Sequence, residues 1–309
     1  MRESAGLFPL NSHKPPVQLL VSLVIISGVA LISFVFILVS AKLIFGIGIN
    51  SIDLERELLT DIEIKFLRYI QAIQHFSLFL LPSLIISLLM TGSIINYLGL
   101  RHRPGYIVLL AVILASVSIL PITSALGVLN SGFELPEWFP KISDWIIRKD
   151  EQAGRLTGWL IKADNTGGLL INIIVLSLLP AFGEEFMFRG IIQNIFTKWF
   201  RSSNLAIWIT AILFSIVHFQ FFGFLPRILL GLFFGYLYHW SSSIWLPVLA
   251  HFINNLVPVL GAYFMGWEEM NNRIAERGLD KGWLILIPFL MVILFMNLIR
   301  SAYKTKTGN

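Results

Sequence analysis

Three ionisable side chains, Glu184, Glu185 and Arg189, interrupt an otherwise apolar stretch that runs from Gly167 to Ile195. A charge at the centre of a helix in hydrocarbon costs about 2.5–3.5 kcal/mol, so such groups indicate a functional site by default. On a helix, Glu185 and Arg189 are four residues apart and share a face, where they can form an ion pair. Glu184 points about 100° away and can face a different neighbour. The alternative interpretation is structural, with the ion pair locking helices together.

Two later apolar stretches carry His218 and His251. Asn255 follows His251 by four residues, so both side chains can extend from one helix face. A carboxylate such as Glu184, assisted by an imidazole, can deprotonate water, and a second imidazole with an amide can stabilise an oxyanion. These groups therefore predict hydrolysis, although His and Glu could instead hold zinc with one position left to water. The other histidines lie in loops or near the ends of apolar stretches and are assigned no chemistry: His13, His75, His102 and His239.

The composition indicates a membrane protein. Of 309 residues, 56% are hydrophobic and 13% are charged, against about 25% charged residues in soluble domains. The net charge of +5 does not indicate nucleic-acid binding, because the basic residues lie in short clusters between apolar stretches. The absence of cysteine excludes disulfides, thiol nucleophiles and cysteine metal sites.

Membrane-spanning helices need about 20 apolar residues, and eight stretches qualify as candidates. Two connecting segments, 51–74 and 134–164, are amphipathic and predict helices that lie on the bilayer surface. We therefore expect an all-α polytopic membrane helix bundle, a single domain over residues 1–309 with a catalytic core at about 167–258. The candidate spans are Pro15–Ala41, Phe76–Leu98, Tyr106–Leu129, Gly167–Phe200, Asn204–Phe221, the block Ile228–Trp267, which divides at Ser241–Ser243 into two, and Trp283–Ile299.

Three short motifs resemble those of a known family. Glu184–Arg189 matches EExxxR, Phe214–His218 matches FxxxH, and His251–Asn255 matches HxxxN. In this order on successive membrane helices, they resemble the CPBP intramembrane proteases, also called the Abi family. That group contains type II CAAX prenyl endopeptidases and bacteriocin-processing or immunity proteins.

The resemblance implies an all-helical membrane fold, a cavity open toward the cytoplasm and a glutamate-dependent peptidase that needs no metal or other cofactor. By this resemblance, Glu184 with His218 would activate water, while His251 and Asn255 would form the oxyanion site. Zinc remains the less favoured alternative, because the sequence has no HExxH pair. The resemblance gives supporting roles to three residues: Glu185, Arg189 and Phe214.

The expected partners are a peptide or membrane-protein substrate and the lipid bilayer, without nucleic acid. The expected location is the cell (inner) membrane of a bacterium, with both termini in the cytoplasm, because Lys and Arg are densest in the short segments on that side. Two other function classes stay open: a proton-coupled transporter, and a non-catalytic immunity or scaffold protein. The basic residues of the predicted cytoplasmic segments are Arg2, Lys14, Arg101, Arg103, Lys198, Arg201, Arg300, Lys304 and Lys306.

Overall fold

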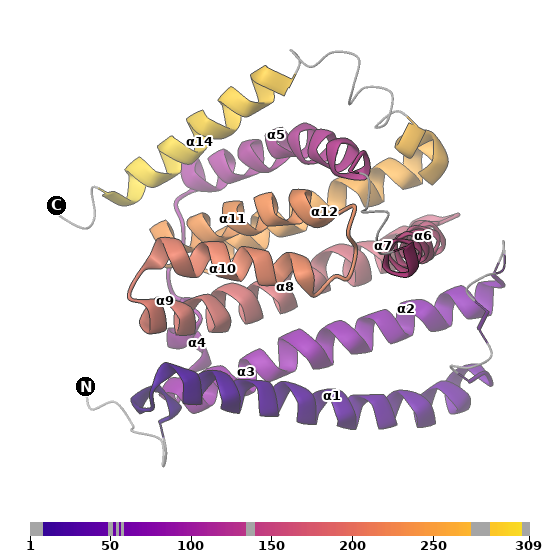
Figure 1. Ribbon diagram of the computed structural model, residues 1–309, viewed down its shortest axis with the longest axis horizontal. Coiled ribbons are helices and arrows are strands. Elements are labelled where there is room, and N and C mark those ends of the chain that lie inside the picture. Colours follow the sequence, from indigo (N-terminus) through magenta and orange to yellow (C-terminus); the bar gives the residue numbers. More distant parts are fainter. Residues whose placement is uncertain are drawn as a thin grey trace.

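A computed structural model describes residues 9–48, 52–53, 56, 59–133, 140–272 and 285–304. In these ranges the chain forms helices joined by turns and contains no strand, which confirms the all-α class (Figure 1). The α-helices and the short 3-10 and π-helical stretches (η) are η1 Leu10–Ser12, α1 Pro15–Phe45, α2 Asp61–His75, η3 Phe76–Leu80, α3 Leu81–Thr91, α4 Ile94–Tyr97, α5 Tyr106–Ser131, α6 Pro140–Ile161, α7 Thr166–Asn172, η4 Ile173–Leu178, α8 Leu179–Glu185, η5 Phe186–Gln193, α9 Asn194–Phe200, α10 Ser203–Ile216, α11 Phe224–Ser241, α12 Trp245–Met265 and α14 Leu286–Lys304.

Six helical segments among the described residues are long and apolar enough to cross a membrane, which makes this an integral membrane protein. The sequence predicted about eight. The difference lies in α10, which has only 14 residues, and in α11, which has 18 and is not among the six. These two helices pack closely, since a Cβ added at Gly231 of α11 would stand 2.8 Å from the Cβ of Ala211 of α10. The six segments are Pro15–Phe45, Asp61–Thr91, Tyr106–Ser131, Thr166–Phe200, Trp245–Met265 and Leu286–Lys304.

In its described C-terminal part, the segment 51–74 that was predicted to form a surface helix is continuous with a candidate span. Helix α2 begins at a capping box, in which Thr60 and Glu63 each bond the other's backbone N–H, and continues through η3 into α3 as one span, Asp61–Thr91. Its polar side chains Gln71 and Gln74 line an internal cavity. The polar face of α2 therefore turns toward the cavity. Residues 51, 54–55 and 57–58 lie outside the described part.

The second predicted surface helix, in segment 134–164, corresponds to α6, and residues 134–139 lie outside the described part. The side chain of Arg68 on α2 donates to the carbonyl oxygen of Leu160 from Nε at 3.2 Å and from Nη2 at 3.1 Å. The side chain of Asn172 on α7 donates to the carbonyl oxygen of Ile161 at 2.7 Å. The C-terminal end of α6 is thus fastened to two spans, and α6 is part of the bundle.

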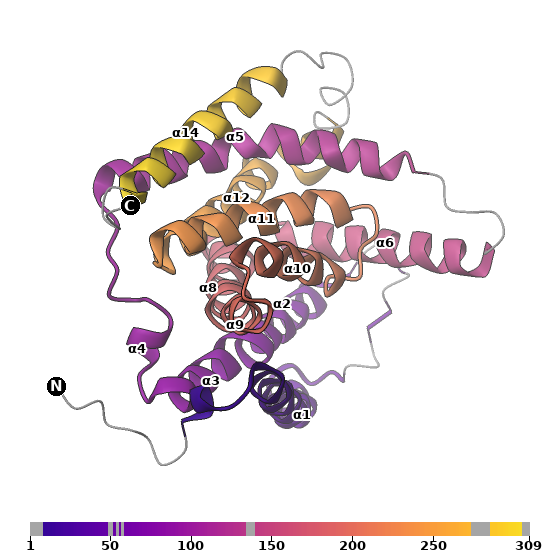
Figure 2. The same ribbon diagram turned by 60° about the vertical axis from the view of Figure 1, so that its left-hand side comes forward.

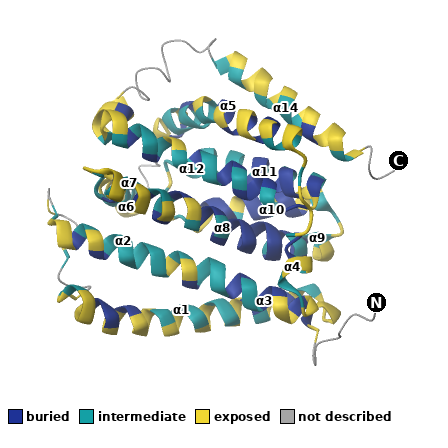
Figure 3. Ribbon diagram, turned by 180° about the vertical axis from the view of Figure 1, so that it is seen from behind, coloured by how far each residue is buried: buried dark blue, intermediate teal, exposed yellow. Residues whose placement is uncertain are grey.

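The centre of the bundle is formed by the segment α8–η5 with α11 and α12, where buried residues are concentrated (Figure 3). The outer helices α1 and α14 leave large apolar side chains exposed, among them Leu31 at 66% and Leu290 at 55%. Such surface is suited to the hydrocarbon of a bilayer.

The described start of α1 and end of α14 lie at the same end of the bundle, whereas α6 lies at the opposite end (Figures 1 and 2). Predicted cytoplasmic basic residues collect at the terminal end: Lys198 of α9 bonds the side chain of Asn11 and lies 5.9 Å from the ring centroid of Tyr97. A cavity walled by α6 therefore extends away from the termini.

Candidate active site

The acidic pair lies where an α-helix changes into a π-helix. Glu184 and Glu185 are the last residues of α8, and Arg189 lies in η5, which follows directly. π-Helical stretches occur frequently at functional sites. The exposed fractions are 5% for Glu184 and zero for Glu185 and Arg189, and Arg189 Nη1 donates to Glu185 Oε1 at 2.9 Å. The structure thus contains the pair that the four-residue spacing predicted.

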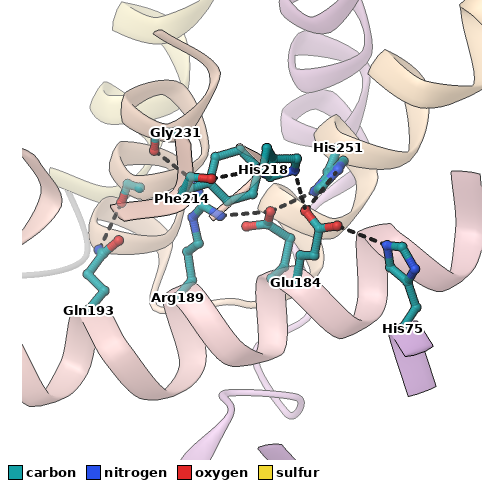
Figure 4. A network of polar contacts seen from close by, with 10 residues as sticks. His75, Glu184, Arg189, Gln193, Phe214, His218, Gly231 and His251 are labelled. Carbon is teal, nitrogen blue, oxygen red and sulfur yellow. Dashed lines mark hydrogen bonds and ion pairs between the residues drawn. The ribbon is translucent and has the colours of Figure 1, made fainter. Parts of the chain in front are cut away.

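Arg189 is enclosed by groups that stabilise a buried cation. Its Nη2 donates to the carbonyl oxygen of Gly231 at 3.0 Å. Its guanidinium carbon lies 4.9 Å from the ring centroid of Phe214 and 5.3 Å from that of Phe234, within the range of cation–π attraction. Arg189 therefore joins the acidic helix to α10 and α11 (Figure 4).

The two motif histidines direct the same ring atom toward Glu184. His251 Nδ1 donates to Glu185 Oε1 at 2.7 Å, and His218 Nδ1 donates to the carbonyl oxygen of Phe214 at 2.6 Å. Each bond leaves Nε2 facing Glu184 Oε2, at 3.9 Å from His251 and 3.8 Å from His218. Oε2 itself is buried and makes no hydrogen bond within the described part of the chain.

Aromatic rings hold both imidazoles in these orientations. The ring of Phe214 meets those of His218 and His251 edge to face, with centroid distances of 5.0 and 6.0 Å. Phe234 stacks on His251 at 5.0 Å with an interplanar angle of 13°. Phe214 thus contacts both imidazoles, and Phe234 was not predicted because no motif includes it.

His75 is a site residue that the sequence analysis missed. Its Nε2 lies 3.2 Å from Glu184 Oε1, closer than either motif histidine approaches this carboxylate. Its Nδ1 donates to the carbonyl oxygen of Gln71 at 3.1 Å. In sequence it stands 109 residues before Glu184, near the junction of an amphipathic segment with a span, so spacing gave no signal.

A glycine permits the close approach of His75. A Cβ added at Gly183 would stand 3.1 Å from the Cβ of Phe79 and 3.4 Å from the carbonyl oxygen of His75. The residue before Glu184 must therefore be small for α8 to pack against the junction of α2 and η3. The sequence contains this glycine, but its role depends on which helix lies opposite.

These groups face a cavity of about 640 Å³, a volume typical of ligand sites. Asn255 and the three histidines line it together with Glu184. The walls come from α2, η3, α6, η4, α8, α10, the loop after α10, α11 and α12. Its other lining residues include apolar side chains, among them Leu156, Leu160, Leu176, Val217, Leu230 and Pro258.

The loop after α10, which carries His218, is fixed from two helices that the motifs do not include. Asn130 of α5 donates to the carbonyl oxygen of Phe221 at 2.8 Å and accepts from the N–H of Leu225 at 3.1 Å. The carboxylate of Asp150 on α6 accepts from the N–H groups of Phe221 and Phe222 at 2.9 and 3.3 Å. Helix α6 therefore contacts the same loop that positions a site histidine.

Metal binding was the alternative to direct water activation. Within the described ranges, no group of three or more His, Cys, Asp or Glu side chains is arranged to hold a metal ion. His75 Nε2, which would have to be bare as a ligand, lies within hydrogen-bonding distance of Glu184.

A comparison with known protein families matches the part of the chain that carries the three motifs. Residues 166–257 match the family described as type II CAAX prenyl endopeptidase Rce1-like, and they contain Glu184, His218, His251 and Asn255. This segment is Rce1-like. The match confirms the resemblance. His75 and α6 lie outside the Rce1-like segment.

One curated relative is the uncharacterized protein YpbD of Bacillus subtilis (strain 168), 30% identical over 90 residues. The aligned region covers 28% of this chain and 43% of the relative, so the chain spans less than half of the relative's length. No solved structure matches the chain.

Proposed function

We propose that this protein is an intramembrane endopeptidase in which Glu184 activates a water molecule to hydrolyse a peptide bond. One observation carries the proposal: the unbonded Oε2 of Glu184 faces Nε2 of His218 and Nε2 of His251 at 3.8 and 3.9 Å inside the cavity. A water molecule can bridge two groups at such a separation with ordinary hydrogen bonds. The match to an endopeptidase family supports the same reaction.

The roles divide according to position. Glu184 with His218 takes the proton from water, and the resulting hydroxide attacks the carbonyl carbon. His251 and Asn255, four residues apart on α12 and both lining the cavity, form the oxyanion site, where the amide of Asn255 donates to the negative oxygen that develops. Glu185 and Arg189 hold His251 and the acidic helix in place. The reaction draws on no resident cofactor in this proposal.

The substrate is a peptide or protein that reaches the cavity from the membrane. The cavity lies within a bundle of membrane helices, and its walls combine apolar side chains with the polar site. A membrane-associated or lipidated peptide has both an apolar part and a polar peptide bond. The rescue experiment identifies the protein that contains the cleaved peptide bond.

Rescue of cells lacking the protein tests the proposal. The parent chain and Glu184→Gln are expressed at equal membrane abundance, and membrane and peptide fractions are compared by mass spectrometry. Glutamine retains the shape of the side chain but cannot accept the proton of water, so fragments produced by the parent should be missing with Glu184→Gln. Identical fragments and phenotype in both rescues would refute the peptidase and favour the non-catalytic immunity or scaffold protein.

We further propose that the chain lies in the cell (inner) membrane of a bacterium with the terminal end of the bundle in the cytoplasm, since Lys and Arg are densest in the short segments at that end. Helix α6 then faces the outer side, and the scissile bond is reached from that side. Because the chain has no cysteine, single-cysteine variants report sidedness directly. Arg155→Cys on α6 should react with an impermeant maleimide in intact cells, and Ser301→Cys on α14 only after lysis; the reverse pattern would overturn this orientation.

A further inference from the structure

His75 differs from the two motif histidines in its hydrogen bonding. Both of its ring nitrogens lie within hydrogen-bonding distance of oxygen acceptors: Nδ1 at 3.1 Å from the carbonyl oxygen of Gln71, and Nε2 at 3.2 Å from Glu184 Oε1. The Nε2 atoms of His218 and His251 are 3.8 and 3.9 Å from the same carboxylate, beyond that distance. A neutral imidazole has only one N–H, so it cannot donate to two acceptors.

Two arrangements satisfy the contacts of His75. Either the imidazole carries two protons beside an ionised Glu184, or a protonated Glu184 donates to a bare Nε2. A protonated Glu184 could not take a proton from water, so the proposed function requires the first arrangement. His75 is then an imidazolium in the resting enzyme.

The position of His75 separates the two oxygens of Glu184. It contacts Oε1, whereas His218 and His251 face Oε2 (Figure 4). Glu184 Oε2 therefore takes the proton from water, while Glu184 Oε1 holds the imidazolium of His75. Because the side chain of His75 also lines the cavity and is 14% exposed, it can reach a substrate atom there.

We propose that His75 is the general acid of this site, donating its Nε2 proton to the nitrogen of the leaving amine. This inference rests on the proposed peptidase function. It assigns a catalytic residue from α2, outside the Rce1-like segment, and so makes that segment incomplete without the N-terminal spans.

The proton transfers balance over one turnover. Glu184 Oε2 takes a proton from water, and the hydroxide oxygen bonds to the carbonyl carbon as the carbonyl electron pair moves to oxygen. His75 then protonates the amide nitrogen, the C–N bond breaks with its electron pair on nitrogen, and the carbonyl bond re-forms. The products are a carboxylic acid and an amine. Rotation of the protonated Glu184 carboxyl group brings its O–H to His75 Nε2, and this transfer restores the imidazolium and the carboxylate.

The first test measures the resting proton without any substrate. The protein is labelled with ¹⁵N-histidine in detergent micelles at neutral pH, and spectra of the parent, His75→Gln and Glu184→Gln are compared. We expect one imidazole with both nitrogens protonated that disappears in His75→Gln and becomes neutral in Glu184→Gln. A His75 signal with one bare nitrogen in the parent would overturn the proposal, whatever the outcome for peptidase activity.

The second test uses the peptide bond found by the rescue experiment, synthesised as the peptide and as the corresponding ester. His75→Gln keeps an N–H donor that can hold Glu184 Oε1 but has no proton to transfer, whereas an ester leaving group needs little protonation. We expect kcat for the peptide to fall by about 10²–10⁴, the range for general acid catalysis, with a much smaller loss for the ester. Equal losses for both would show that His75 only positions Glu184.

Controls separate this inference from the proposed function. His239→Gln, an exposed histidine on α11 outside the cavity, should leave both rates and the melting temperature unchanged. If Glu184→Gln cleaves as the parent does, the peptidase proposal fails. If Glu184→Gln is inactive while His75→Gln is folded and cleaves the peptide at the parent rate, only the role of His75 fails.

Discussion

Replacing Arg189 by methionine should destabilise the bundle strongly. Arg189 is fully buried, and it supplies the cation beside Glu185, which is also fully buried. Methionine fills most of the volume, so the variant removes the charge without leaving a large cavity. The variant also removes the hydrogen bond that Arg189 donates to the carbonyl oxygen of Gly231.

Removing one partner of a buried ion pair typically costs about 3–5 kcal/mol, because the other charge remains in low dielectric. His251 Nδ1 still donates to Glu185 Oε1 at 2.7 Å, which places the expectation at the lower end of that range. A loss of about 3 kcal/mol lowers the ratio of folded to unfolded protein by roughly a hundredfold, since about 1.4 kcal/mol corresponds to tenfold.

Equilibrium unfolding in mixed micelles measures this loss, with Arg155→Met on the exposed side of α6 as the matched control. The double variant Glu185→Gln, Arg189→Met removes both charges and should recover part of the stability lost in Arg189→Met alone. If Arg189→Met unfolds within about 0.5 kcal/mol of the control, within the ordinary range of surface substitutions, the pair does not stabilise the fold and the argument from burial is wrong.

Two further predictions concern the contacts that position the site. Gly183→Val should cost about 1–3 kcal/mol and reduce cleavage, because the added carbons would push α8 away from Phe79 and the backbone of His75, whereas Gly154→Val, with nothing within 4 Å of the added Cβ, should not reduce cleavage. Thermal unfolding and cleavage rates check both variants, and equal behaviour would refute the close-packing argument. Asp150→Ala should increase hydrogen exchange at the amide of Phe221 and lower activity without unfolding the protein, since the carboxylate fastens α6 to the loop of His218. Asp144→Ala, exposed on the same helix, is the control, and unchanged exchange in Asp150→Ala would contradict a fastening role.

The helical class and the extent of most spans follow from the sequence because burial in lipid demands long apolar stretches. Helix periodicity also predicted that Glu185 and Arg189 would pair while Glu184 turned to another neighbour. Motif spacing alone could not show that His218 and His251 lie near Glu184, and that expectation came from the family resemblance. The structure brings their Nε2 atoms to within 4 Å of one oxygen.

His75 and Asp150 escaped sequence reasoning for a different reason. Each acts on a segment that is distant in the chain, 109 residues from Glu184 for His75 and 71 from Phe221 for Asp150. Asp150 belongs to an amphipathic segment and His75 directly follows one, and charged or polar residues in such segments are ordinarily taken to face solvent. Only the packing of α2 and α6 against the central helices shows that these faces turn inward.

Chelation decides between the two forms of water activation that the site residues allow. Zinc is bound at about 2.0–2.1 Å by bare imidazole nitrogens, usually with the other ring nitrogen held by an acceptor. His218 and His251 meet the second condition through Phe214 and Glu185, but the Nε2 of His75 contacts Glu184 directly. We therefore expect cleavage to persist after exhaustive dialysis against a chelator, with the metal content of the dialysed protein measured in parallel. A loss of cleavage that zinc alone restores would refute the glutamate mechanism and would make the three imidazoles candidate ligands.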